Sequence, residues 1–138
     1  MSPLMSDDNI SRMFKDPKVE ATVNEPSTLQ LIQAEFEQSF AKVKDKLGES
    51  WQDIRTIYEM ACDSSFTMKK DVKIVVIGAL AYLVSPFDLL PERRLGPLGL
   101  VDDVAVLLFA LKFARPEVER YRSYKSTAAG GGDADRRT

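Results

Sequence analysis

Residues 73–84 read KIVVIGALAYLV and residues 101–114 read VDDVAVLLFALKFA, and these two apolar runs decide the fold. The β-branched residues of the first run also suit a strand, but the run is long, contains alanines and is not interrupted by a turn residue. The second run is apolar on nearly every helical face, which is typical of a helix buried in protein or in lipid. We therefore predict two helices, from near residue 67 to 84 and from 101 to 114. Both must be shielded from water by protein or by lipid.

The connection between the two runs carries SPFDLLPE at residues 85–92 and GLVDD at residues 99–103. Pro86 disfavours helical geometry at Ser85 and suits the first position of a new turn, so the first helix is expected to end there. Asp88 lies three residues after Ser85 and can bond back to the Ser85 amide. The runs are therefore expected to form a helical hairpin with a locked turn.

Four carboxylates lie along this connection: Asp88, Glu92, Asp102 and Asp103. The last two fall in the first turn of the second helix, where the helix dipole favours each acid by only ~0.3–1 kcal/mol. Because oxygen ligands suit Mg²⁺ or Ca²⁺, a hard-cation site is the alternative to a turn-locking role, with a metal-dependent hydrolase one step beyond it. No positioned base or phosphate-cradling loop accompanies the acids, which disfavours the hydrolase. Turn locking through the Ser85 amide is the main interpretation for Asp88.

Two amphipathic segments precede the hairpin, at residues 27–47 and 50–62, with Gly48 as the stop between them. Ser27–Gln30 and Ser50–Asp53 have the capping-box form. We expect two helices that fold back on each other and cover the hairpin. Their predicted inner stripes are Leu29, Ile32, Phe36, Phe40, Val43 and Leu47 in the first helix, and Trp51, Ile54, Tyr58 and Ala61 in the second.

The two ends of the chain lack such patterns. Residues 1–26 show no sustained period, and we predict a flexible leader that adds nothing to the core. Arg115–Glu117 predicts a break followed by a short helix to about Tyr124, and the polar, Gly-rich residues 125–138 are expected to be disordered. The expected fold is an all-α bundle of four to five helices, with an amphipathic hairpin at residues 27–66 and an apolar hairpin with its C-terminal helix at residues 67–124.

Composition excludes several classes of function. The 138 residues include no histidine, which removes the commonest general base and transition-metal ligand. Cys62 is the only cysteine, so the chain has no internal disulfide and no cysteine-based zinc site, and we interpret Cys62 as a structural thiol. A net charge of −2 does not favour nucleic acid as a partner. The first ten residues do not have the pattern of a secretory signal, and no cofactor is expected.

The Ser-Pro-x-Asp-Leu-x-Pro element followed by Gly-x-x-Asp-Asp resembles the signature of the YkvA-like family, a bacterial domain of unknown function (domain of unknown function 1232). The resemblance covers roughly residues 72–110 and implies a paired-helix hairpin, often membrane-associated, with no established catalytic activity. Glu92 stands where the family usually has Asp, and the connection at residues 93–97 is longer and less apolar, which weakens the cation-site hypothesis. The signature positions here are Ser85, Pro86, Asp88, Pro91, Gly99, Asp102 and Asp103.

The uncharged stretches of the hairpin are 11 residues (74–84) and eight residues (104–111), whereas a helix that crosses a bilayer needs ~20. A simple span is therefore not expected. Lys73 and Lys112 would mark the open end of the hairpin and Arg93 and Arg94 its closed end, an arrangement that suits a shallow insertion as well as a protein core.

We therefore expect a non-enzymatic helical module that docks on a membrane surface or a protein partner through the apolar hairpin, while residues 27–66 cover the hairpin in the free state. Self-association is left open, and the expected location is cytoplasmic or peripheral to the inner membrane. The candidate contact residues are Leu80, Leu83, Phe87, Leu107, Leu108 and Phe109.

Overall fold

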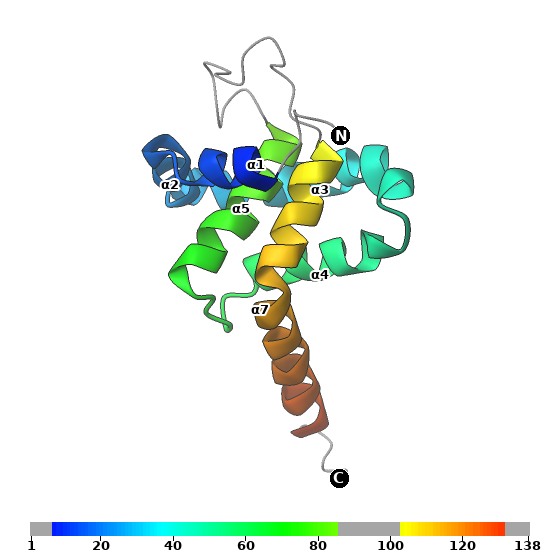
Figure 1. Cartoon of the computed structure of the whole chain (residues 1–138). Helices are drawn as coiled ribbons and strands as arrows, with labels where there is room; N and C mark the ends of the chain where they lie inside the picture. The colour runs from blue at the N-terminus through cyan, green and yellow to red at the C-terminus, as the bar shows by residue number, and fades with distance from the viewer. Residues whose placement is uncertain (1–6, 86–102, 132–138) are drawn as a thin grey trace.

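The computed structural model describes residues 7–85 and 103–131, and every regular element in these ranges is helical (Figure 1). The predicted all-α bundle is therefore confirmed, and residues 73–84 form a helix rather than a strand. The elements are α1 (Asp7–Phe14), α2 (Pro17–Val23), α3 (Pro26–Leu47), the 3-10 turn η1 (Gly48–Ser50), α4 (Trp51–Cys62), α5 (Lys70–Val84) and α7 (Asp103–Gly131).

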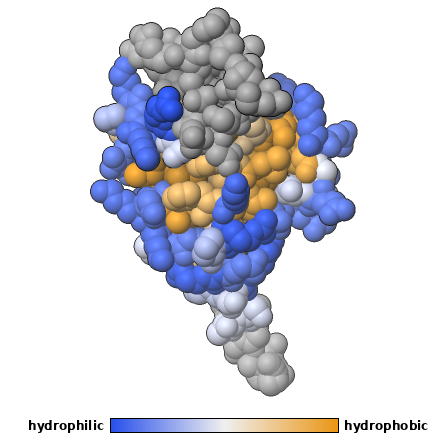
Figure 2. All heavy atoms as spheres, in the orientation of Figure 1, coloured by the Kyte–Doolittle hydropathy of each residue, from blue (hydrophilic) through white to orange (hydrophobic). Residues whose placement is uncertain are grey.

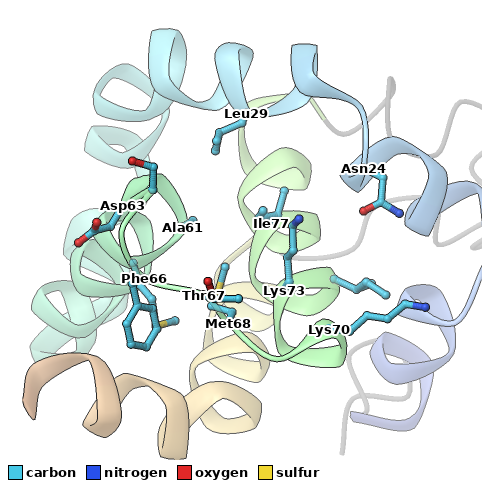
Figure 3. A pocket seen from close by; sticks show the side chains of 13 residues that line it. Asn24, Leu29, Ala61, Asp63, Phe66, Thr67, Met68, Lys70, Lys73 and Ile77 are labelled. Carbon is cyan, nitrogen blue, oxygen red and sulfur yellow. The ribbon is translucent and has the colours of Figure 1, made fainter. Parts of the chain in front are cut away.

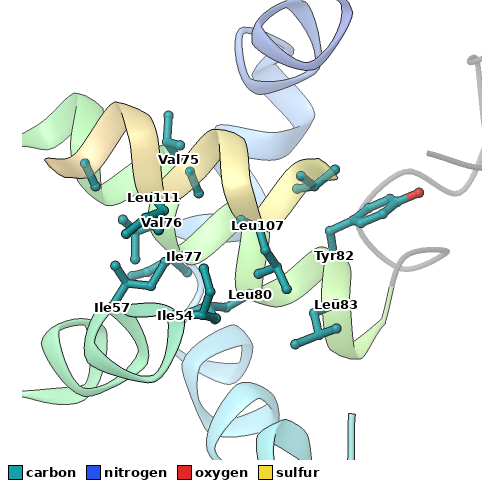
Figure 4. Packing of buried hydrophobic residues seen from close by; sticks show 14 of the residues in the cluster. Ile54, Ile57, Val75, Val76, Ile77, Leu80, Tyr82, Leu83, Leu107 and Leu111 are labelled. Carbon is teal, nitrogen blue, oxygen red and sulfur yellow. The ribbon is translucent and has the colours of Figure 1, made fainter. Parts of the chain in front are cut away.

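Helix α5 occupies the centre of the bundle. Every residue from Val75 to Leu83 is buried, because α1, α2, α3, α4 and α7 all pack against this helix. Figure 4 shows Ile54 and Ile57 of α4 meeting the apolar side chains of α5, with Leu107 and Leu111 of α7 beside them. A helix that is apolar all round must be covered on all sides, and here the chain itself supplies that cover.

Helices α3 and α4 form the predicted amphipathic hairpin. Gly48 ends α3 with φ at +60°, a backbone conformation that glycine adopts without a steric cost. The Phe36 and Tyr58 rings stack with their centroids 3.8 Å apart, and Arg55 forms a two-pronged ion pair with Glu37 at 2.8 and 2.9 Å. The predicted stripes are buried at Ile32, Phe36, Phe40, Val43, Leu47 and Ile54, and partly buried at Leu29, Trp51, Tyr58 and Ala61.

The two predicted capping boxes are wrong. Helix α3 begins at Pro26 rather than Ser27, because proline suits the first helical position, and the Thr28 hydroxyl donates instead to the Thr22 carbonyl. Ser50 makes no side-chain cap, because the 3-10 turn already holds it in a helical conformation.

The predicted flexible leader is also wrong for residues 7–23. Helices α1 and α2 lie in this range, and the Asp16 carboxylate caps α2 by accepting the Lys18 amide. Phe14 packs on α5 at Gly78, where an added Cβ would lie 2.8 Å from the ring. Helices α1 and α2 therefore cover one side of α5. The buried apolar residues of these two helices are Ile10, Met13, Phe14, Val19 and Val23.

Helix α7 continues through Pro116, so the predicted break at Arg115–Glu117 and the predicted disorder of residues 125–131 are wrong. Beyond the proline, α7 is tied to the loop between α4 and α5. The Lys69 amide and the Arg120 guanidinium both donate to the Glu117 carboxylate, and the Tyr121 hydroxyl donates to Asp63 at 2.9 Å. These bonds hold the helix where proline removes one backbone donor. Residues 132–138 lie outside the described ranges.

Candidate docking surface

The N-terminal half of α7 has two apolar faces. The inner face packs on the core and consists of Val106, Leu107, Ala110, Leu111 and Ala114. We call the other face the outer face of α7; it consists of Val104, Ala105, Leu108, Phe109 and Phe113. The side chains of Leu108 and Phe113 are 37% and 41% exposed. Figure 2 shows apolar residues gathered across the side of the molecule on which α7 lies in Figure 1.

An aromatic row crosses this surface from α1 to α7. The centroids of Phe14 and Phe109 are 5.9 Å apart, those of Phe109 and Phe113 are 6.2 Å apart, and both pairs are stacked. Phe14 is buried, Phe109 is partly buried and Phe113 is exposed. The row therefore starts in the core and ends in solvent, which gives the exposed end a rigid support.

A pocket of about 320 Å³ opens beside this row, between α1, α2, α5 and α7. Its apolar walls are Phe14, Ile74, Val75, Phe109 and Phe113, and its polar walls are Ser11, Lys15, Glu20 and Asp71. Glu20 lies 3.7 Å from the Lys70 ammonium, and the Asp71 carboxylate accepts the Val72 amide at 2.8 Å. The rim thus carries charges of both signs around an aromatic floor.

The predicted contact residues divide into two groups. Leu108 and Phe109 lie on the outer face of α7, but Leu80, Leu83 and Leu107 are buried in the core and cannot touch an external partner in this conformation. Helices α3, α4 and α7 cover that side of α5, as expected for the free state, so contact through these three residues stays a prediction. Phe87 lies outside the described residues. Sequence reasoning missed Phe113, which its spacing of four from Phe109 could have indicated.

Most of the acidic connection lies outside the described ranges, including Pro86, Asp88, Pro91, Glu92, Gly99 and Asp102. Ser85 follows the last residue of α5 and donates its amide to the Ala81 carbonyl at 2.8 Å, so the helix ends where predicted. Asp103 is the first residue of α7. Within residues 7–85 and 103–131, no group of three or more acidic, Cys or His side chains is placed to hold a metal. The cation-site hypothesis therefore stays a prediction.

Cys62 is the one cysteine of the chain and therefore its candidate thiol nucleophile. Burial raises the pKa of the Cys62 thiol, and hydrogen bonds with Gln33 and Tyr58 offset only part of this effect. The thiol is therefore un-ionised near neutral pH, which agrees with a structural role. In the part of the chain that the structure describes, no helix combines the length and the hydropathy that a bilayer crossing requires.

Comparison with known families identifies the central hairpin. Residues 72–109 match the family described as a protein of unknown function, DUF1232. The resemblance to the YkvA-like family is thereby confirmed for this segment. The DUF1232 segment covers nearly all of α5 and ends at Phe109, so it includes most of the outer face of α7 but neither Phe113 nor the covering helices.

The chain is also similar to the E3 ubiquitin-protein ligase RNF170 of three vertebrates. It is 32% identical to the Danio rerio protein over 113 residues, which are 77% of this chain and 41% of that protein. It is 48% identical to the Xenopus laevis protein over 40 residues, which are 29% of this chain and 16% of that protein. It is 31% identical to the Xenopus tropicalis protein over 103 residues, which are 69% of this chain and 40% of that protein. The chain thus spans about two fifths or less of these relatives. No solved structure matches it.

Proposed function

We propose that this chain is a non-enzymatic helical module that docks a protein partner through the outer face of α7. The observation that carries the proposal is the second apolar face of this helix, where Leu108 and Phe113 stay exposed although the inner face is already buried. An aromatic row with an exposed end next to a pocket is typical of a surface that receives a large apolar side chain.

The charges around the pocket favour a protein over a membrane. A surface that binds anionic lipid needs a basic rim, and carboxylates beside it would be repelled. Here Lys15 stands on the same rim as Glu20 and Asp71. Such a mixed rim suits an amphipathic helix that places an apolar residue in the pocket and pairs its own charges around it.

The relatives give this proposal modest support. RNF170 is named as a ubiquitin-protein ligase, a class that acts on proteins, and its region of similarity covers 77% of this chain. In such a protein, we propose that the shared region binds a protein partner and takes no part in catalysis.

The test places a photo-crosslinking amino acid, p-benzoylphenylalanine, at position 113 and identifies the adduct by mass spectrometry. We expect one protein that is crosslinked from position 113 and not from position 42, an exposed site on α3. The purified partner should then lose at least tenfold in affinity for the Leu108→Glu variant, because a carboxylate would be buried without a counter-charge at the interface.

The chain offers a matched control in Leu31→Glu, because Leu31 on α3 is 36% exposed and Leu108 is 37% exposed. This variant should bind the partner as the unmodified chain does. Sedimentation with vesicles that contain phosphatidylglycerol should leave the protein in solution. Crosslinking to lipid, to a second copy of the chain, or equally from both positions would contradict the proposal.

A further inference from the structure

A larger pocket, of about 520 Å³, shares the lining residue Ile74 with the pocket beside the aromatic row, and Figure 3 shows its walls. It opens between the end of α2, the start of α3, the end of α4, the loop that follows α4, and the first half of α5. Its lining residues are Asn24, Leu29, Met60, Ala61, Asp63, Ser64, Phe66, Thr67, Met68, Lys70, Lys73, Ile74 and Ile77.

The walls of this pocket are mostly apolar. Met60, Phe66 and Ile77 are buried in the core, whereas Leu29 and Met68 are only partly buried and so are available to a ligand. Methionine side chains are unbranched and adaptable, so the partly buried Met68 can follow the shape of a flexible chain. The volume falls within the usual range for small-molecule pockets of ~300–1,000 Å³.

Lysine supplies the positive charge of the pocket, but the two lysines differ. Lys70 reaches toward α2, where its ammonium lies 3.7 Å from Glu20. Lys73 is exposed and forms no ion pair within the described residues, and Figure 3 shows its side chain lying beside Ile77 in the opening. Asn24 lies on the same side of the opening as Lys73. This side of the pocket can therefore receive an anionic group.

The opposite side of the pocket disfavours an anion. Asp63 lies there (Figure 3), and its carboxylate already accepts the amide and hydroxyl of Ser65 at 2.9 and 2.6 Å and the Tyr121 hydroxyl at 2.9 Å. These bonds hold the pKa of Asp63 below its usual value, the Ser65 hydroxyl contributing most, so the group is ionised. A bound anion is thereby directed away from Asp63 and toward Lys73.

We propose that this pocket binds a medium-chain fatty carboxylate, with the carboxylate at Lys73 and Asn24 and the alkyl chain along Leu29, Ala61 and Met68. Both parts of the ligand are needed. The lysine is solvent-exposed, so its charge alone holds a small anion weakly, and the apolar walls alone would not distinguish an acid from an alcohol.

The test is isothermal titration of the full chain with decanoate below its micellar concentration, with decanol and acetate as comparison ligands. We expect saturable decanoate binding and at least tenfold weaker affinity for decanol and acetate. The Lys73→Met variant should lose about tenfold in decanoate affinity while its affinity for decanol stays within twofold. The Lys42→Met variant removes an exposed lysine of α3 outside the pocket and should bind decanoate normally.

A second measurement locates the ligand. Amide chemical shifts should move with decanoate near Leu29, Ala61 and Lys73, and not near Phe113 on the outer face of α7. The proposal would be overturned by no saturable binding, by equal decanoate affinity in Lys73→Met, by decanol binding as tightly as decanoate, or by shifts centred on α7. The decanoate measurements report on the pocket at Lys73 and the crosslinking measurement reports on the outer face of α7. Either proposal can therefore fail without the other.

Discussion

Gly78 is the residue at which α1 reaches the central helix. An added Cβ there would lie 2.8 Å from Cε1 and 3.1 Å from Cδ1 of Phe14, closer than van der Waals contact allows. Phe14 cannot simply turn away, because it is buried and stacks on Phe109. We therefore expect Gly78→Ala to lower the free energy of unfolding by about 1–3 kcal/mol, net of the gain of up to ~1 kcal/mol that alanine brings to a helix.

The control repeats Gly78→Ala in a chain from which the Phe14 ring has been removed, so that the new Cβ has nothing to clash with. In a Phe14→Ala background the next neighbour of the new Cβ is Val19 at 3.5 Å, an ordinary contact. Gly78→Ala should then stabilise the chain by about 0.5–1 kcal/mol through helix propensity alone. Urea unfolding of the four proteins gives the double-mutant cycle, and the same effect in both backgrounds would show that Phe14 does not restrict this position.

Glu117 is a buried carboxylate, 3% exposed, that joins α7 to the start of α5. It accepts the Lys69 amide at 2.8 Å and pairs with Arg120 at 2.7 Å. Glu117→Ala leaves the amide without its partner, so we expect a loss of about 1–3 kcal/mol in the free energy of unfolding. Urea unfolding measures this loss. Glu119→Ala, on the same turn but exposed and paired with Arg122, should change stability by no more than ~0.5 kcal/mol.

At the scale of the helices, the sequence predicts what is long and periodic and misses what is short. The apolar run of α5 and the stripe from Ile32 to Leu47 are visible because several turns repeat the same pattern. Helices α1 and α2 have only eight and seven residues, too few turns to show a period, and Pro17 and Pro26 suggest a loop although both occupy first helical positions.

The continuity of α7 was unpredictable for a different reason. Pro116 is a strong local signal for a break, and only contacts distant in sequence oppose it. The Arg120 guanidinium donates to the Thr67 carbonyl at 2.8 Å, and the Tyr124 hydroxyl donates to the Ser65 hydroxyl at 2.7 Å. These partners lie more than fifty residues away in the chain, so no local pattern reveals them.

Removing residues 1–23 tests whether α1 and α2 belong to the core. Five buried apolar side chains would be lost, each worth about 1.5–3 kcal/mol, and their sum is comparable to the ~5–15 kcal/mol by which small domains are stable. We expect the shortened chain to lose its cooperative thermal transition and to bind an apolar dye. Removing residues 128–138 should leave the transition in place, since Tyr121 is the last buried residue among those of α7 whose side chains the structure describes. Equal melting of the full and N-terminally shortened chains would show that α5 does not need this cover.

At the scale of the whole molecule, the sequence predicted that the two apolar helices need shelter, but it could not tell which of their faces the chain covers. A helix that is apolar all round gives no direction for its inner side. Leu80, Leu83 and Leu107 therefore appeared equivalent to Leu108 and Phe109, and only the packing of α3, α4 and α7 separates them. The pocket at Lys73 was equally hidden, because its walls come from three helices, the residue that follows α2, and the loop after α4.

The carboxylates that bond to α7 by ion pairs or hydrogen bonds also predict how the whole fold responds to acid. Hydrogen bonds from Arg120 lower the pKa of Glu117, and Ser65 lowers that of Asp63. Burial alone would raise the pKa of Asp53, but bonds from Arg122 and Arg115 outweigh it and lower the value. The folded chain thus binds fewer protons than the unfolded chain as these groups titrate, so their contribution to stability is present above their ordinary pKa of ~4 and is lost as pH falls through the lowered values.

We therefore expect the urea midpoint of unfolding to be nearly constant from pH 7 to pH 5.5, because the chain has no histidine to titrate there, and to fall steadily between pH 5 and pH 3. The variant Glu117→Gln with Asp63→Asn should start from a lower midpoint at pH 7 and lose less of it in acid, since two of the responsible carboxylates are gone. A midpoint that rises in acid, or an equally steep fall in the variant, would mean that carboxylates elsewhere control the acid response and that the ties between α7 and the α4–α5 loop contribute little to it.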